Sequence, residues 1–424
     1  TAGGSNQGTF ANPFTSIASF NAINTGVAPN GKDGDHVVLR GTSYNEADGI
    51  NLRNTQTLTG GATNFNTVFT ADGNSTAVYT TFAGSTPGAP TINATAGDGI
   101  DLGSGNAIRG LNVGNTPGFF GFDGTAVGNL VVATVNKTGT GGAINVATSG
   151  AFGGNVNFGT LESTSSPDDN ISLVGVTGTL GVGAAGTGLS NSANLATSHG
   201  INISGGSVSL TYLGNISKGN LGALINVSGG HTGTLTFNTG TLSATNGSGL
   251  QFDNADGTYN FNGTTTLNGG DAGIDILAGA DAVAGSTGTF TFGTGTSITR
   301  ANSVSGEAFN LAGSDANVTY SGSMSLGTST GNMIAISDHD AGIITFQTGT
   351  LTKGILAGAN ATQGISVSNS NGGTINFNGP IVIFMSTANA VSLTTNTGGV
   401  MNFAGGLALT TTSGTGFNAT GGGT

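Results

Sequence analysis

The sequence predicts an all-β protein, a parallel β-helix (β-solenoid) in which about 27 residues make one coil. Three observations support this prediction. A short apolar-polar-apolar unit recurs along most of the chain, a second unit that ends in an aromatic residue follows it at the same period, and 80 of the 424 residues are glycine. Repeats of this length cannot each bury an apolar face alone, but stacked copies can bury one continuous core.

The first recurring unit is a small residue followed by apolar, polar and apolar residues. This alternation has the period of a β-strand with one buried face. We therefore expect each copy to form a short strand that stacks on the copy before it. The first apolar residues of the copies are Ile50, Ile100, Ile144, Ile171, Ile201, Ile225, Leu250, Ile274, Phe309, Ile334, Ile365, Val391 and Phe417.

Two further units follow the first one in the second half of the chain. One is apolar, polar, aromatic, and the other is a short apolar strand beyond a glycine corner. Each coil is thus predicted to hold three short strands, with the aromatic side chains pointing inward. The aromatic residues are Phe237, Phe261, Phe292, Tyr320, Phe346, Phe377 and Phe403, and the third strands carry Leu242, Leu267, Ile298, Leu326, Leu351, Ile383 and Leu409.

Glycine is expected at the corners between strands, where the backbone needs a positive φ or a tight approach. From Ile144 onward the spacing between copies ranges from 24 to 35 residues, which predicts corner loops of variable length, the longest of them between Ile274 and Phe309. Outward threonines, as in Thr234-Leu235-Thr236, are expected to form polar ladders. The scatter in spacing argues against the flat lattice of ice-binding solenoids.

The two ends of the chain differ. Asn12 followed by Pro13 and an apolar stripe predicts a short N-terminal helix, capped by Asn12, that covers the first coil. We therefore divide the chain into an N-terminal cap and first coil over residues 1–48 and a β-helix over residues 49–424. The last repeat, at Phe417, has no such cover, so the β-helix is expected to continue past Thr424 or to stack on a partner.

Composition excludes several classes of function. The chain has no cysteine, which excludes disulfides and thiolate chemistry, and its net charge of −12 makes a nucleic-acid partner unfavourable. No apolar run approaches the roughly 20 residues of a membrane span. The low charge content and the abundance of threonine, serine and asparagine are typical of exported bacterial surface proteins.

The N-terminal part of the sequence carries a resemblance to a known family. Its segments are NPFTSI at residues 12–17, GDHVVL at 34–39, GTSY at 41–44 and GINL at 49–52. They resemble the opening of pectate-lyase-like parallel β-helix proteins, and the later repeats are similar to bacterial autotransporter passenger and surface adhesin repeats. The resemblance implies a right-handed, single-stranded β-helix, in a group that includes lyases, hydrolases, adhesins and stalks.

One group of residues is a candidate for catalysis. Asp168 and Asp169 precede the strand at Ile171, and His199 precedes the strand at Ile201, so all three are expected at the same corner of consecutive coils. Similar carboxylates serve inverting polygalacturonases of this fold, in which they protonate the leaving oxygen and activate water. The Asn-Thr-Asp and Arg-X-Lys segments of those enzymes do not occur here. Corner residues that face solvent are the alternative interpretation, and it is the one we favour.

Several aspartates offer oxygen ligands of the kind that Ca²⁺ accepts. The candidates are Asp253 and Asp256 in one corner and Asp338 and Asp340 in another. Neither corner matches an EF-hand loop or a calcium β-roll repeat. We therefore interpret these residues as turn carboxylates and predict no structural metal and no cofactor.

These observations predict a structural protein rather than an enzyme. We expect an exported β-solenoid of a bacterial cell surface that acts as a fibre or filament subunit or as an adhesin stalk. Self-association, head to tail or lateral, is the expected partnership, with a glycan or host surface as a possible further partner. The alternatives are a polysaccharide-active β-helix enzyme, similar to an inverting hydrolase, and a glycan-binding adhesin.

Overall fold

The computed structural model is an all-β parallel β-solenoid of about 12 turns, with about 26 residues per turn. This confirms the predicted fold class. The structure describes residues 14–27, 31–61, 88–183, 188–190, 192–281, 283–302, 306–354 and 362–423. The chain forms two compact units, Thr1–Leu189 and Ser190–Thr424, which we describe separately. The described residues contain no helix with the length and hydropathy of a membrane span.

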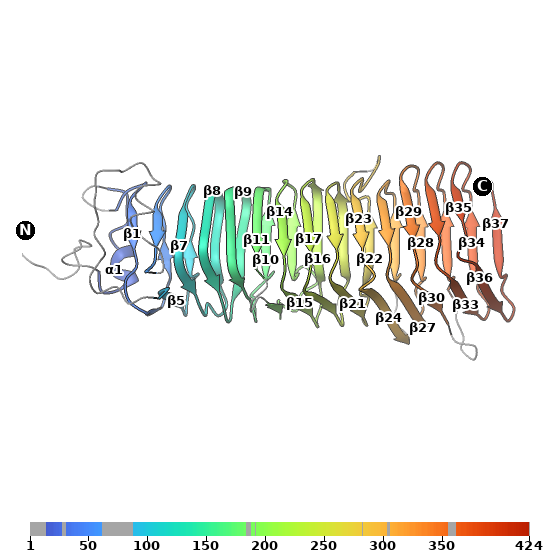
Figure 1. Cartoon of the computed structure of the whole chain (residues 1–424), viewed down its shortest axis with the longest axis horizontal. Coiled ribbons are helices and arrows are strands. Elements are labelled where there is room, and N and C mark those ends of the chain that lie inside the picture. Colours follow the sequence, from blue (N-terminus) through green and yellow to red (C-terminus); the bar gives the residue numbers. More distant parts are fainter. Residues whose placement is uncertain are drawn as a thin grey trace, which may run out of the picture. The chain divides into compact units, whose positions relative to one another are not determined.

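A single short helix, α1 (Ile17–Asn21), precedes the strands of the first unit (Figure 1). Ser16 caps it by accepting a hydrogen bond from the Ser19 amide, so the prediction of Asn12 as the cap is wrong, and Asn12 itself lies outside the described residues. The Asn21 side chain exchanges hydrogen bonds with the backbone of Gly49 and Asn51. The helix therefore covers the backbone edge of an early strand, as a cap of the first coil should.

The strands of the first unit pair in parallel. They are β1 (His36–Val38), β2 (Ser43–Glu46), β3 (Ile50–Asn51), β4 (Thr57–Thr59), β5 (Thr91–Ala94), β6 (Ile100–Asp101), β7 (Ala107–Val113), β8 (Phe120–Lys137), β9 (Gly142–Leu161), β10 (Ile171–Val174) and β11 (Val176–Val182), and β12 (Gly188–Ser190) follows. Ile50 pairs with Ile100, although 50 residues separate them in the sequence. This separation exceeds the 35 residues between the register partners Ile274 and Phe309.

Two strands of the first unit depart from the predicted pattern of three short strands per coil. β8 and β9 have 18 and 20 residues and run around corners without interruption. Their pairing shifts register at several points, and Asn129 and Thr134 take positive φ values of 52° and 57°. The chain turns there through bulges rather than through separate glycine corners.

The second unit follows the predicted pattern of three parallel ladders. The first ladder is β13 (Ile201–Ser204), β16 (Ala223–His231), β19 (Gly249–Ala255), β22 (Gly273–Leu277), β25 (Phe309–Ala312), β28 (Ile334–Ser337), β31 (Ile365–Ser368), β34 (Val391–Thr394) and β37 (Phe417–Thr420). The second is β14 (Ser209–Tyr212), β17 (Thr234–Phe237), β20 (Thr258–Phe261), β23 (Thr289–Phe292), β26 (Asn317–Tyr320), β29 (Ile343–Phe346), β32 (Thr374–Phe377) and β35 (Val400–Asn402). The third is β15 (Asn215–Lys218), β18 (Thr241–Ala244), β21 (Thr264–Asn268), β24 (Thr296–Asn302), β27 (Ser323–Thr328), β30 (Leu351–Lys353), β33 (Ile381–Met385) and β36 (Leu407–Thr411).

In the core of the second unit, equivalent apolar residues of successive coils stack on one another. Ile201, Ile225, Leu250 and Ile274 pair in one register and are fully buried. The aromatic residues of the second ladder also point inward, as predicted. The rings of Phe261 and Phe292 stack with their centroids 5.1 Å apart. These columns replace the single hydrophobic core of a globular domain.

A column of glycines forms the corner after the aromatic column. A Cβ atom at Gly263 would lie 2.6 Å from the carbonyl oxygen of Gly240 in the preceding coil, which is closer than side chains approach a backbone oxygen. A Cβ at Gly349 would overlap the carbonyl oxygen of Gly322 in the same way. The glycines at this corner are therefore required by the close approach of successive coils.

Candidate functional site

The predicted catalytic residues lie in corners of both units. Asp168 and Asp169 precede β10 in the first unit, where the Asp169 side chain is buried and its carbonyl oxygen accepts a hydrogen bond from Ser166 Oγ. His199 lies in the second unit, where its Nδ1 accepts a 2.9 Å hydrogen bond from the Ala223 amide. His199 thus holds the backbone of the next coil. Catalysis by these residues stays a prediction.

Two of the aspartates considered as metal ligands bind backbone groups of the following coil. Asp256 Oδ1 accepts hydrogen bonds from the amide and the hydroxyl of Thr287, at 3.0 and 2.8 Å. Asp340 Oδ1 accepts one from the Asn371 amide at 2.8 Å. These contacts fit the interpretation as turn carboxylates, because each carboxylate supplies the acceptor that a corner amide needs.

A different group of carboxylates lies close together in the first unit. Asp98, Asp101 and Asp123 each offer an oxygen within 4.8 Å of the others. Asp101 and Asp123 are register partners in β6 and β8, and Asp98 lies just before β6. Asp98 Oδ1 accepts a 2.6 Å hydrogen bond from the Phe120 amide, and Asp123 Oδ1 accepts one from Asn145 Nδ2 at 2.7 Å.

The packing of these carboxylates changes their protonation. Partial burial, together with the negative charges of Asp98, Asp48 and Asp123, raises the pKa of Asp101 to about 7. Burial also raises the pKa of Asp98. Three carboxylate oxygens at this distance can share a proton or bind a hard divalent cation such as Ca²⁺. None of the aspartates considered from the sequence belongs to this cluster.

The sequence contained a signal for this cluster. GFDG at residues 121–124 matches the first three positions of the first recurring unit, and its aspartate occupies the same position as Asp101 in Gly99-Ile100-Asp101-Leu102. Recognising that copy would have placed Asp123 directly beside Asp101, since register partners point to the same face of a sheet. The copy is harder to see because Gly124 stands where the other copies have an apolar residue.

The raised pKa of Asp101 predicts a stability that depends on pH. A carboxyl whose pKa is higher in the folded state stabilises the fold at acid pH, and this contribution disappears as pH rises through about 7. Asp101→Asn should therefore raise the melting temperature at pH 8 by about 2–4 °C, or about 1 kcal/mol after allowance for solvent screening, and leave it unchanged at pH 4. Thermal unfolding at both pH values tests this. An equal shift at both, or a decrease at pH 8 without added cations, would contradict it.

Four basic side chains lie inside the coils. Lys137, Lys218, Arg300 and Lys353 are at most 1% exposed. Arg300 Nη2 donates to the carbonyl oxygens of Asp271 and Glu307, at 3.1 and 2.8 Å, and the other three also donate to backbone carbonyls. Burial lowers the pKa of both Lys137 and Lys353 to about 8. These cations fasten loops to the coils.

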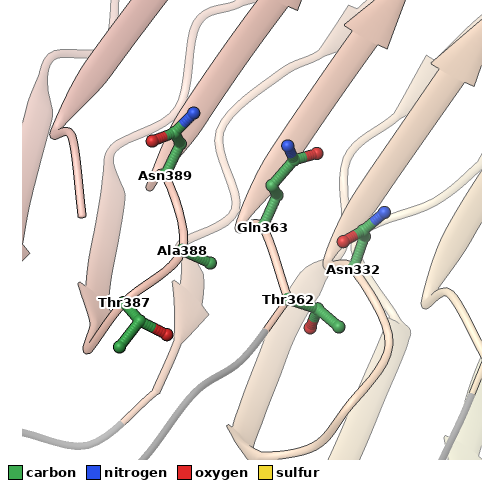
Figure 2. A pocket seen from close by; sticks show the side chains of 6 residues that line it. All are labelled: Asn332, Thr362, Gln363, Thr387, Ala388 and Asn389. Carbon is green, nitrogen blue, oxygen red and sulfur yellow. The ribbon is translucent and has the colours of Figure 1, made fainter.

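An open depression of about 430 Å³ lies in the second unit (Figure 2). Its lining carries amides and hydroxyls and no charged group. The hydroxyl of Thr362 is held by Lys353 Nζ at 3.0 Å, and the Asn389 Oδ1 accepts a hydrogen bond from the Thr415 amide. Such a set of donors and acceptors suits a neutral polar ligand. The lining residues are Asn332, Thr362, Gln363, Thr387, Ala388 and Asn389.

The described residues thus include carboxylates that hold corner amides, a cluster of three acidic groups at β6 and β8, and an uncharged depression. Each of these features combines side chains from successive coils, so their geometry depends on the register of the ladders. Compared with family models, with curated proteins and with solved structures, the chain matches none of them.

Proposed function

We propose that the chain is an exported structural β-solenoid of a bacterial cell surface, a fibre or filament subunit or an adhesin stalk, without catalysis. One observation supports this most directly. In the second unit three parallel ladders repeat the same cross-section, and the first of them pairs without a register shift from β19 to β34. Each added coil lengthens such a solenoid without changing its cross-section. This property suits a protein that extends from a cell surface and presents a binding site at a distance from it.

The composition and the resemblance to autotransporter passenger and adhesin repeats support the same role. An uncharged depression lined by amides supports a second candidate, a glycan-binding adhesin. Both candidates use the coil stack as a rigid support for surface contacts.

The proposal includes self-association through the coil formed by β35, β36 and β37. Phe417 is 43% exposed, whereas its register partner Val391 is fully buried. Leu407 and Leu409 are also partly exposed, although both continue columns that are buried in the preceding coils. A second copy that stacks on this coil, or a further coil of a longer chain, would bury these side chains and pair the strand edges.

A charge at Phe417 should weaken this association. We expect wild-type chain to assemble with rising concentration in analytical ultracentrifugation, and Phe417→Lys to raise the apparent dissociation constant at least about tenfold, because the stacked coil would have to bury an ammonium. Thr410→Lys, at an exposed position of β36, is the matched control and should assemble like the wild type. Electron micrographs of the wild type should show filaments. Monodisperse monomers at every concentration would overturn the self-association proposal.

A further inference from the structure

Several asparagines of the second unit are followed directly by glycine. Because glycine has no Cβ, the backbone nitrogen after such an asparagine is unhindered and can attack the side-chain carbonyl carbon through a five-membered ring. The asparagines of these pairs are all exposed, so exposure does not distinguish them. A further pair begins at Asn30, which lies outside the described residues. The pairs of the second unit begin at Asn246, Asn262, Asn268, Asn371 and Asn378.

At Asn246 the structure places the two reacting groups side by side. The Gly247 amide donates a hydrogen bond to Asn246 Oδ1 over 2.9 Å, so its nitrogen lies beside the carbonyl group that it would attack. Loss of the amide proton would leave a lone pair directed at that group. Asp48 makes the same contact with the Gly49 amide at 3.0 Å, but the negative charge of a carboxylate resists attack by an anionic nitrogen.

The packing of the corner requires the glycine that makes this asparagine reactive. Gly247 has a positive φ of 72°, and a Cβ atom there would lie 2.1 Å from the carbonyl oxygen of Gly222 in the preceding coil. Gly247 is buried, which keeps its nitrogen in place. Asn246 is exposed, so water can reach its side chain and ammonia can leave.

Two of the other pairs have their glycine nitrogen tied to the backbone. The amide that follows Asn262 donates to the carbonyl oxygen of Phe237 at 3.1 Å, and the amide that follows Asn378 donates to that of Phe346 at 3.4 Å. Each of these nitrogens would have to give up a hydrogen bond to a distant carbonyl before it could turn toward its own asparagine. The fold therefore protects these two pairs.

The remaining two pairs also lack the arrangement seen at Asn246. The side-chain oxygen of Asn371 accepts a hydrogen bond from a threonine hydroxyl at 2.7 Å, which holds it away from the following glycine. Asn268 is the last residue of β21, and among the described residues it makes no hydrogen bond with Gly269. Sequence alone makes the five pairs equivalent, whereas their contacts do not.

We propose that Asn246 is a site of spontaneous modification, at which the side-chain amide becomes a carboxylate through a cyclic imide. In the first step the Gly247 nitrogen bonds to Asn246 Cγ, the Cγ–Nδ2 bond breaks, and Nδ2 leaves as ammonia with the proton of the glycine nitrogen. Water then opens the imide at either carbonyl and gives aspartate or isoaspartate. The reaction needs only water, and it is independent of whether the chain self-associates.

The isoaspartate product would alter the corner. It lengthens the backbone by one methylene between residues 246 and 247, where successive coils already touch. A Cβ atom at Gly270 in the following coil would lie only 2.4 Å from Asn246 Oδ1, so the added atoms have little room. Conversion also adds one negative charge to a chain of net charge −12.

Peptide mapping of the whole folded chain after incubation at pH 8 tests the proposal. Conversion adds about 1 Da at a site, and labelling with an isoaspartyl methyltransferase identifies isoaspartate. We expect Asn246 to convert first, about tenfold faster than Asn262 or Asn378, because the glycine amides of those pairs must first break a hydrogen bond. In denaturant the five sites should convert at similar rates, since each precedes a glycine.

Two variants complete the test. Asn246→Gln should remove the early gain in mass, because glutamine would have to close a less favourable six-membered ring. Asn262→Gln is the matched control and should keep the early gain, and circular dichroism melts verify that both variants are folded. Two results would overturn the proposal. One is conversion of any of the other four sites as fast as Asn246 in the folded chain, and the other is an unchanged early gain in mass in folded Asn246→Gln.

Discussion

Phe292→Ala is expected to lower the free energy of unfolding by about 3–5 kcal/mol. Phe292 is fully buried in the second ladder, and its ring contacts Phe261 at 5.1 Å on one side and Tyr320 at 6.1 Å on the other. Removing the ring leaves a cavity inside a column whose neighbours are fixed by their strands. The surrounding coils cannot collapse into it without breaking register, so the cost should lie near the upper end of the range.

Denaturant unfolding monitored by circular dichroism measures this loss. Thr291→Ala, the adjacent outward residue on the same strand, is the control and should change stability by less than about 0.5 kcal/mol. Equal stability of Phe292→Ala and wild type would show that the ring does not contribute to the core. A loss of similar size in the control would show instead that the strand, rather than the ring, is sensitive.

Gly349→Ala should destabilise the second unit by about 1–3 kcal/mol. The added methyl group would overlap the carbonyl oxygen of Gly322, which belongs to the backbone of the preceding coil and cannot rotate away. Relief requires the two coils to separate at this corner, which weakens the hydrogen bonds of the strands on either side.

Gly219→Ala, at the corner that follows β15, is the control for Gly349→Ala. A Cβ at Gly219 would meet only Thr245 Oγ1, at an ordinary 3.6 Å. The substitution should be neutral or stabilise the protein by up to about 1 kcal/mol, because alanine restricts the unfolded chain more than glycine does. Equal melting temperatures for Gly349→Ala and Gly219→Ala would contradict the role assigned to the close approach of coils.

The sequence repeat predicts the strands and the core residues of the second unit well, because both follow from the local alternation of apolar and polar residues. Alternation places Ile225 and Leu250 inward, and a shared period places them in one column, so no knowledge of distant contacts is needed. The bends of β8 were not predictable in this way. They depend on positive φ at Asn129 and Thr134, and a threonine gives no sequence signal for this conformation, because β-branched residues rarely adopt it.

The charged groups show where sequence reasoning ends. Lys353 belongs to a short third strand, and its burial depends on the carbonyl of Gly331 and the hydroxyl of Thr362, which come from other segments. The pKa of Asp101 likewise depends on Asp98, Asp48 and Asp123 together. Residue type and spacing predict which stacked column a side chain belongs to. They do not predict which groups from other segments surround its charged end.

The internal basic residues have a consequence for how the protein is degraded. Trypsin cleaves after lysine and arginine, and beyond Arg109 the chain has only Lys137, Lys218, Arg300 and Lys353 as cleavage points, all of them in the interior. A protease of this specificity therefore has to wait for a coil to open before it can cut. Digestion of the native protein should stop at a long resistant fragment.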